Sequence, residues 1–233
     1  MEWLEKKKCL NKLTLQIFAM AVMFIDHGGV ALLPEVLILR CIGRLAFPIF
    51  AWFVAEGYAR THSFKKYLLR MVIFALLSEI PFDFMNLGRI WAGYMQNVLW
   101  TFCIALLCLR WLDKLRQRHE GTLLWAADMV LVSAVGFAAG ELLCTDYGGW
   151  GVLLVIAFSL CRERKNRPLA ELVCMAAFCL CFGGIEFFAL LSLPLLWLYN
   201  GKPGRQSRAV QYVCYAFYPA HLLILGLIAF CLR

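Results

Sequence analysis

Long apolar runs, separated by short polar connections, recur from Leu13 to Leu232 and constrain this chain more than any motif. A helix needs roughly 20 mostly apolar residues to cross a hydrocarbon core about 30 Å thick. Of the 233 residues, 63% are hydrophobic and only 16% are charged, whereas soluble domains carry about 25% charged residues. The sequence therefore predicts an all-α, polytopic membrane helix bundle, with residues 1–233 forming one integral membrane domain.

About nine segments are predicted to form transmembrane helices. The sixth, seventh and eighth are short for full crossings, so they could instead be re-entrant or paired helices. In chain order, the predicted segments are Leu13–Leu33, Val36–Tyr58, Tyr67–Leu87, Asn97–Leu112, Thr122–Leu143, Trp150–Cys161, Leu169–Phe182, Ile185–Tyr199 and Val210–Leu232.

Basic residues lie on alternate connections, and this pattern sets the expected orientation. Lysine and arginine stay on the cytoplasmic side of a membrane because they translocate poorly. The N-terminal segment and the second, fourth, sixth and eighth connections hold 19 of the 23 basic residues. The other connections carry only Arg89. The N-terminus, with Lys6 and Lys7, is therefore predicted to be cytoplasmic, and the C-terminus to be outside.

Charge and cysteine content exclude some other classes. The net charge of +8 does not require a nucleic-acid partner, because the basic residues sit on short loops beside the lipid bilayer. The 11 cysteines include no C-x-x-C pair, and no histidine stands at metal-ligand spacing from them. We expect neither a disulfide framework nor a bound metal.

Polar and ionisable residues within or beside the apolar segments are functional candidates, because a charge inside a bilayer costs several kcal/mol. With the predicted orientation, most fall in the outer half of the membrane, and their charges alternate in sign. Arg44 could pair with Glu79, and Arg40 with Asp83, either to join helices or to line a polar cavity. The candidates are Asp26, His27, Arg40, Arg44, Glu79, Asp83, Asn97, Thr101, Asp146, Tyr147, Glu186 and, near the middle of the last segment, His221.

Several short segments, taken together and in this order, resemble the TraX family. The resemblance implies a multi-pass protein of the bacterial inner membrane that transfers an acetyl group from acetyl-CoA. The family's namesake acetylates the N-terminus of a pilin subunit, and the implied acceptor is such an amine, or a hydroxyl or amine of a surface polymer, at the outer side. The matching segments are 23–28 (MFIDHG), 40–50 (RCIGRLAFPIF), Glu56-Gly57, 77–83 (LSEIPFD), Asn97 with Thr101, 146–148 (DYG) and 217–221 (FYPAH).

The resemblance also implies roles for individual residues. Acyl transfer needs a base for the nucleophile's proton and donors for the oxyanion that develops on the carbonyl. His27 is implied as the base, with Asp26 or Glu79 orienting its ring. His221 is the competing histidine. Residues implied to bind the oxyanion, the acetyl-CoA or the acceptor are Arg40, Arg44, Asp83, Asn97, Thr101, Asp146, Tyr147 and Tyr218.

The nucleotide of acetyl-CoA has no recognisable binding motif, since neither G-x-G-x-x-G nor a P-loop is present. We expect it to dock at a composite site near the basic inner loops. Two other classes remain open at this stage: a small secondary transporter or channel, whose buried charges would bind its cargo, and a non-catalytic membrane chaperone of a surface subunit. Neither should bind or hydrolyse acetyl-CoA.

Overall fold

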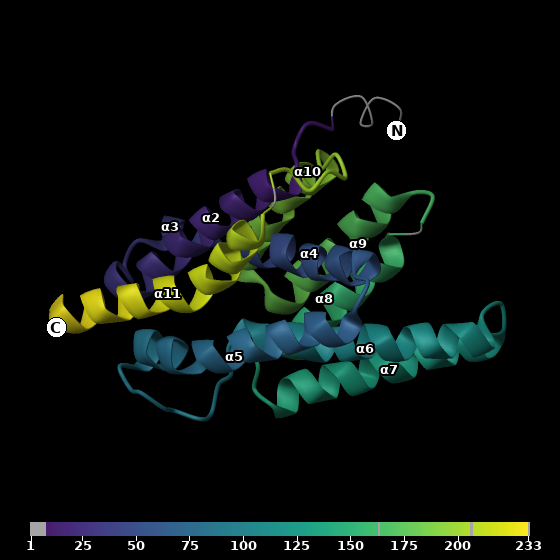
Figure 1. Ribbon diagram of the computed structural model, residues 1–233, viewed down its shortest axis with the longest axis horizontal. Helices are drawn as coiled ribbons and strands as arrows, with labels where there is room; N and C mark the ends of the chain where they lie inside the picture. The colour runs from purple at the N-terminus through teal and green to yellow at the C-terminus, as the bar shows by residue number, and fades with distance from the viewer. Residues whose placement is uncertain (1–7, 163, 206, 233) are drawn as a thin grey trace. The chain divides into compact units, whose positions relative to one another are not determined.

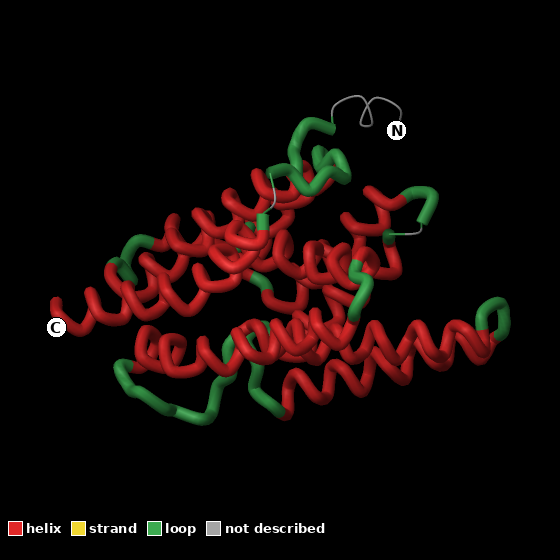
Figure 2. The backbone as a smooth tube through the Cα atoms, in the orientation of Figure 1, coloured by secondary structure: helices red, strands yellow, loops and turns green. Residues whose placement is uncertain are grey.

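The computed structural model describes residues 8–162, 164–205 and 207–232, so Lys6 and Lys7 of the basic N-terminal segment lie outside it. Within the described residues the chain is built from helices, without any strand beyond isolated bridges (Figure 2). The predicted all-α class is therefore confirmed.

The helices follow the predicted segments, and most boundaries agree within a few residues (Figure 1). Two segments are divided: the second becomes α3 and α4, and the eighth becomes a 3-10 helix, η1, followed by α10. The bounds are α2 Lys12–Leu32, α3 Leu37–Gly43, α4 Ala46–Arg60, α5 Phe64–Leu87, α6 Val98–His119, α7 Leu123–Leu142, α8 Gly148–Cys161, α9 Arg167–Phe182, η1 Gly184–Leu191, α10 Ser192–Trp197 and α11 Arg208–Leu232.

Local sequence signals explain where several of these helices begin. The side chain of Asn11 caps α2 by accepting a hydrogen bond from the backbone N–H of Thr14 at 3.0 Å. Asn97 caps α6 in the same way, through the N–H of Leu99. Pro194 lies in the first turn of α10, where its missing N–H has little cost, so a new helix can begin after η1.

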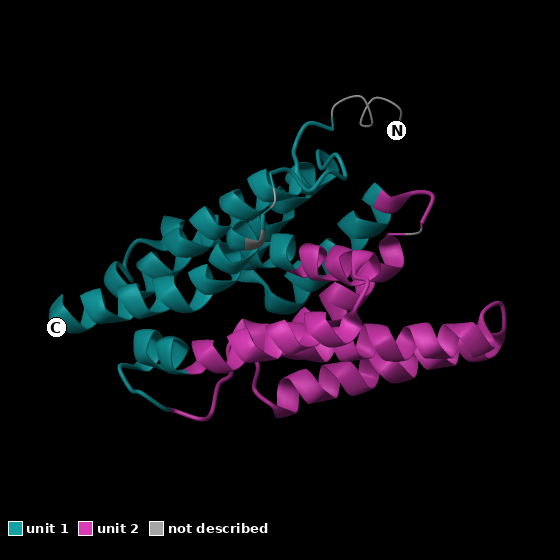
Figure 3. Cartoon of the chain, in the orientation of Figure 1, with its two compact units in different colours: residues 1–50, 80–91, 168–233 teal, residues 51–79, 92–167 magenta. Residues whose placement is uncertain are grey.

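The described structure divides into two compact units, each built from separate stretches of chain (Figure 3). Unit 1 comprises residues 1–50, 80–91 and 168–233. Within it, α2 packs against α3 and α11, and α3 also contacts η1. Gly43 permits the close approach of α3 to α2, because a Cβ there would lie 2.1 Å from the Cβ of Asp26.

Unit 2 comprises residues 51–79 and 92–167, and its helices α6, α7 and α8 pack against one another. A Cβ added at Gly136 of α7 would lie 2.7 Å from the sulfur of Cys108 on α6. The buried Glu56 of α4 binds Arg60 at 2.5 Å and Arg162, just after α8, at 3.1 Å. That residues 1–233 form one integral membrane domain stays a prediction.

Four helical segments of the described chain are long and apolar enough to cross a membrane. Large apolar side chains remain exposed on them, among them Leu123, Val130 and Leu142 of α7. Exposed apolar area of this kind is unfavourable in water, and it indicates a membrane protein. The four segments are Lys12–Leu32, Leu37–Arg60, Leu123–Leu142 and Ala209–Leu232.

Candidate functional site

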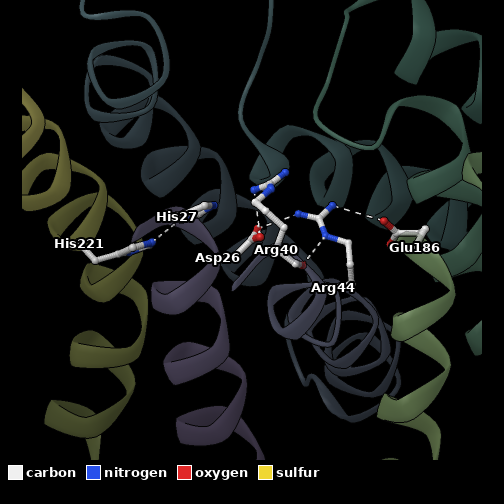
Figure 4. Close-up of polar contacts among 6 residues, drawn as sticks. All are labelled: Asp26, His27, Arg40, Arg44, Glu186 and His221. Carbon is white, nitrogen blue, oxygen red and sulfur yellow. Dashed lines mark hydrogen bonds and ion pairs between the residues drawn. The ribbon is translucent and has the colours of Figure 1, made fainter. Parts of the chain in front are cut away.

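Asp26 and His27, neighbours on α2, begin two separate polar clusters of unit 1 (Figure 4). Successive side chains of an α-helix point about 100° apart, so the two residues face different partners. Asp26 faces the arginines of α3 and its C-terminal end, whereas His27 faces α11.

The Asp26 carboxylate binds both arginines. Arg40 Nη1 lies 2.9 Å from Asp26 Oδ1, and Arg44 Nη2 lies 2.8 Å from Oδ2. Arg44 also reaches Glu186, in the first turn of η1, with Nη1 3.3 Å from Oε2. Two guanidinium groups thus face two carboxylates, which balances the charge of the cluster. Removing one partner would leave a buried charge without compensation, which is costly.

The second cluster joins His27 to His221 of α11. His27 Nδ1 lies 2.7 Å from His221 Nε2, and the ring planes differ by only 5°. His221 Nδ1 lies 2.7 Å from the carbonyl oxygen of Phe217, one turn earlier in α11. Because a carbonyl only accepts, His221 Nδ1 carries the proton, and Nε2 of the neutral ring accepts from His27 Nδ1–H. In this chain of hydrogen bonds His27 Nε2 carries no proton, so its lone pair can accept a hydrogen bond or a proton from another group.

Aromatic side chains fix the orientation of the two imidazoles. The Phe217 ring lies nearly parallel to that of His221, with centroids 4.7 Å apart. Tyr218 meets both histidines edge-on, its centroid 6.4 Å from that of His27 and 5.7 Å from that of His221. His221 is 2% exposed, whereas His27 is only half-buried. His27 is therefore the more exposed histidine of the pair.

The two clusters together place a base near cationic groups, since they begin at adjacent residues. The Arg40 side chain is 30% exposed and that of Arg44 only 12%, so Arg40 keeps more of its N–H donors open to the surroundings. Such an arrangement can take a proton from a nucleophile and stabilise negative charge that develops nearby. Within the described chain, no three His, Cys, Asp or Glu side chains are grouped to hold a metal ion.

A separate group of unit 2 surrounds Glu79 of α5. Its Oε1 accepts from the backbone N–H of Asn97 at 3.2 Å and from Asn97 Nδ2 at 2.5 Å. The indole N–H of Trp100 donates to the same oxygen at 2.7 Å. Thr101 lies in the first turn of α6, and its hydroxyl donates a hydrogen bond to the carbonyl oxygen of Asp146. These bonds tie the start of α6 to α5 and to the connection before α8.

The predicted site residues fall into two groups, one in each unit. Unit 1 brings together Asp26, His27, Arg40, Arg44, Tyr218 and His221. Asp83 is also buried in unit 1. The group in unit 2 holds Glu79, Asn97, Thr101 and Asp146, and Tyr147 precedes α8 with a left-handed φ of 62°.

The described ion pairs of the two arginines are not the pairs that the sequence suggests. The sequence suggests Glu79 and Asp83, four residues apart on α5, as their partners. The described ion pairs run to Asp26 and Glu186, and a pairing with Glu79 or Asp83 stays a prediction. The physical reason is that α3 follows α2 after a short turn and packs directly on it, so its basic side chains meet the carboxylate of α2.

The orientation of His27 also differs from the sequence prediction. Asp26 or Glu79 is the expected orienting acid, whereas the described partner of the His27 ring is His221. Helical geometry turns the Asp26 side chain away from its neighbour, and Glu79 is held by Asn97 and Trp100.

Two buried acids, Glu186 and Glu171, make contacts in the structure that the sequence did not predict. Glu186 binds Arg44, and this bond was not foreseeable from its position in the sequence. Glu171 of α9 is fully buried and accepts a hydrogen bond from the indole N–H of Trp197 at 3.0 Å. The sequence did not single out Glu171, because it follows the basic Arg167 by only four residues. Such spacing is typical of ordinary charges near the end of a helix.

The chain is similar to one protein family and to two bacterial proteins. A model described as TraX protein matches residues 11–229. The "Probable fimbrial assembly protein FimC, serogroup H1" of Dichelobacter nodosus is 28% identical over 237 residues, which cover 91% of this chain and 92% of the relative. An uncharacterized protein of Rickettsia prowazekii (strain Madrid E) is 26% identical over 144 residues, 54% of each chain. No solved structure matches the chain.

Proposed function

The chain belongs to the TraX family, and from this premise we propose that it is a membrane-embedded acyltransferase. It moves an acetyl group from acetyl-CoA, its co-substrate, to an amine or hydroxyl at the outer side of a bacterial inner membrane. The observation that carries the proposal is the hydrogen-bonded pair of His27 and His221, whose geometry leaves one imidazole nitrogen for the acceptor.

The proposed reaction begins when His27 Nε2 takes the proton of the acceptor. The acceptor's nitrogen or oxygen attacks the carbonyl carbon of the thioester, and the carbon–sulfur bond breaks as the carbonyl forms again. The proton held by His27 passes to the departing sulfur of CoA, so the reaction balances without another reactant. General-base catalysis of this kind is typically worth about 10²–10⁴-fold in rate.

His221 acts in this scheme as a positioning residue. Its Nε2 holds His27 in the Nδ1–H tautomer, so that the basic Nε2 atom is presented to the acceptor. When His27 gains the second proton, its bond to His221 becomes charge-assisted and therefore stronger. The carbonyl of Phe217 in turn holds the His221 ring. This arrangement supports His27, the more exposed ring, as the base.

The two arginines have different roles in the proposed reaction. Arg44 bridges Asp26 and Glu186 and is the more buried of the two, which suits a structural role. Arg40 is more open, and its guanidinium carries five N–H donors of which Asp26 occupies only part. We assign Arg40 to stabilisation of the oxyanion on the thioester carbonyl.

The acceptor that we propose is a subunit of a surface fibre. The relative from Dichelobacter nodosus is described as a probable fimbrial assembly protein and matches nearly the whole chain. A surface polymer with free hydroxyls or amines would suit the same chemistry. The second candidate function is that of a non-catalytic chaperone for such a subunit, which the same relative favours and which would leave acetyl-CoA intact.

The membrane arrangement that we propose has nine crossings with a cytoplasmic N-terminus. The alternation of basic connections supports it, as do the four long apolar segments and the shorter apolar stretches 148–161 and 184–197. The 14 residues of α8 and the 16 of α9 would rise about 21 and 24 Å. Such short helices are accommodated by local thinning of the bilayer.

Transfer by the purified protein tests the proposal. The full chain in lipid nanodiscs is supplied with acetyl-CoA labelled in its acetyl group and with envelope material as acceptor, and the transferred label is measured. Wild type and His62→Ala, a control at an exposed histidine, should both transfer. His27→Ala should lose at least about 100-fold. If wild type leaves acetyl-CoA intact while fibre assembly in cells still requires the protein, the chaperone is the correct function.

A further inference from the structure

A cavity of about 550 Å³ in unit 2 is not used by the proposed chemistry. Its walls come from the start of α5 and from one face of α6. Its size lies within the roughly 300–1,000 Å³ of small-molecule sites. The residues that line it and matter here are Phe64, Lys65, Leu107, Arg110, Trp111 and Lys114.

The α6 wall is built by helical spacing. Leu107, Arg110, Trp111 and Lys114 stand at positions i, i+3, i+4 and i+7, so they share one face of the helix. The guanidinium carbon of Arg110 lies 5.8 Å from the centroid of the Phe64 ring, a cation–π arrangement that joins the two walls.

The lining combines positive charge with aromatic surface. Three of its side chains are cations, and among the described side chains that line it none is a carboxylate. The nearby Asp113 accepts a hydrogen bond from the hydroxyl of Tyr58, and the same hydroxyl contacts Arg110. Lysine and arginine bind phosphate groups, while an indole or phenyl ring provides a stacking face for a base. A phosphorylated aromatic ligand satisfies both halves of this lining.

We infer that this cavity binds the phosphorylated adenine nucleotide of the coenzyme A thioester. The inference rests on the proposed acetyl transfer, because that reaction requires such a co-substrate. The 3′-phosphate and the diphosphate meet Lys65, Arg110 and Lys114, and the adenine stacks on Trp111. In the proposed topology, the start of α5 and the second half of α6 lie at the cytoplasmic side, where CoA is made. These residues form the composite nucleotide site that the sequence leads us to expect near the basic inner loops.

Anionic lipid headgroups share the phosphate chemistry, and basic residues with tryptophan also occur at ordinary membrane interfaces. The nucleotide is favoured because the cations and both aromatic rings line one open hollow of about 550 Å³ instead of a flat rim. A headgroup has no base that would stack on the face of Trp111. Binding in nanodiscs of neutral lipid, without anionic lipid, separates the two sources.

Binding of CoA and of adenosine 3′,5′-bisphosphate to the full chain in neutral-lipid nanodiscs tests the inference. Both should bind, and adenosine without phosphates should bind far more weakly. Lys114→Glu should weaken binding by at least about tenfold, and Trp111→Ala should weaken it several-fold. The matched control is Lys66→Glu, an exposed lysine beside Lys65 that does not line the cavity, and it should bind as wild type does.

Three results would overturn the inference: no nucleotide binding in neutral nanodiscs, binding that requires phosphates but is weakened equally by Lys66→Glu and Lys114→Glu, or displacement of the nucleotide by anionic lipid at low mole fraction. Kinetics separate this site from the proposed function. Transfer with an unchanged KM for acetyl-CoA in Lys114→Glu would remove the site and keep the function. Specific nucleotide binding without any transfer would keep the site and remove the function.

Discussion

His27 and His221 should respond differently to substitution, because only His27 keeps a ring nitrogen for the acceptor. His27→Ala should lower kcat for acetyl transfer by about 10²–10⁴-fold. His221→Ala removes one hydrogen bond from the base and should cost about tenfold. His221→Gln should recover part of that loss, since its amide oxygen can accept from His27 Nδ1–H. Transfer that survives His27→Ala but is abolished by both His221 variants would reverse the roles.

Arg44 should matter more for stability than Arg40. Arg44→Ala leaves Glu186 without this partner and Asp26 with one guanidinium instead of two. Loss of one partner in a buried ion pair costs about 3–5 kcal/mol. Arg40→Ala should cost clearly less, because Asp26 keeps Arg44 and the Arg40 side chain is partly exposed. Thermal unfolding in detergent measures both variants, and equal losses would argue against the bridging role of Arg44.

The members of the two polar clusters in unit 1 were largely predictable from the sequence, but their pairing was not. An ionisable group in an apolar segment stands out from the sequence by its cost alone, and Asp26, His27 and His221 were found in that way. Which groups touch depends on tertiary contacts that connect positions 194 residues apart, as between the two histidines. Adjacency in sequence misleads here, since neighbours on a helix point in different directions.

At the scale of elements, the contact between α2 and α3 depends on Gly43. Its missing Cβ makes room for Asp26, whose own Cβ would otherwise lie 2.1 Å away. Gly43→Ala should therefore push the two helices apart. It should lower the free energy of unfolding by about 1–3 kcal/mol, as overpacking does, and it should also reduce acetyl transfer. Gly28→Ala is the matched control in α2, because a Cβ there meets nothing within 4 Å. A Gly43→Ala protein as stable and active as Gly28→Ala would contradict this view of the contact.

Helices were predictable from apolar runs, whereas breaks within them were not. The run that gives α3 and α4 reads as one continuous segment, yet α3 ends at Gly43 and Arg44 turns to bind two acids. Hydropathy does not mark this break, because apolar residues continue on both sides of it. The division between η1 and α10 is similar, although Pro194 offers a local signal for it.

At the scale of the whole molecule, composition and motif order carry the information about class and family. Residues 11–229 match the TraX model, and exposed apolar helices indicate a membrane protein. The division of the chain into two units had no counterpart in the sequence, because each unit is assembled from separated stretches. Such assembly follows from which helices pack together, and periodicity within each helix does not determine that choice.

The proposed topology can be tested with cysteines that the chain already has. Cys144, between α7 and α8, and Cys9, just before α2, are both exposed thiols. Nine crossings with a cytoplasmic N-terminus place Cys144 outside and Cys9 inside. An impermeant maleimide added to spheroplasts should therefore label the peptide that contains Cys144, whereas Cys9 should react only after lysis. Mass spectrometry of the peptides gives the readout without a cysteine-free background, which could disturb the buried cysteines.

Two controls make this labelling decisive. Cys144→Ser should remove the label from its peptide in spheroplasts, and lysis of the same cells should expose Cys9 to show that this thiol is reactive. The positive-inside pattern is the physical reason for the expected asymmetry, because the basic N-terminal segment would have to be translocated for the opposite orientation. Labelling of Cys9 in intact spheroplasts, with Cys144 protected until lysis, would invert the molecule and place the proposed nucleotide cavity on the wrong side of the membrane for CoA.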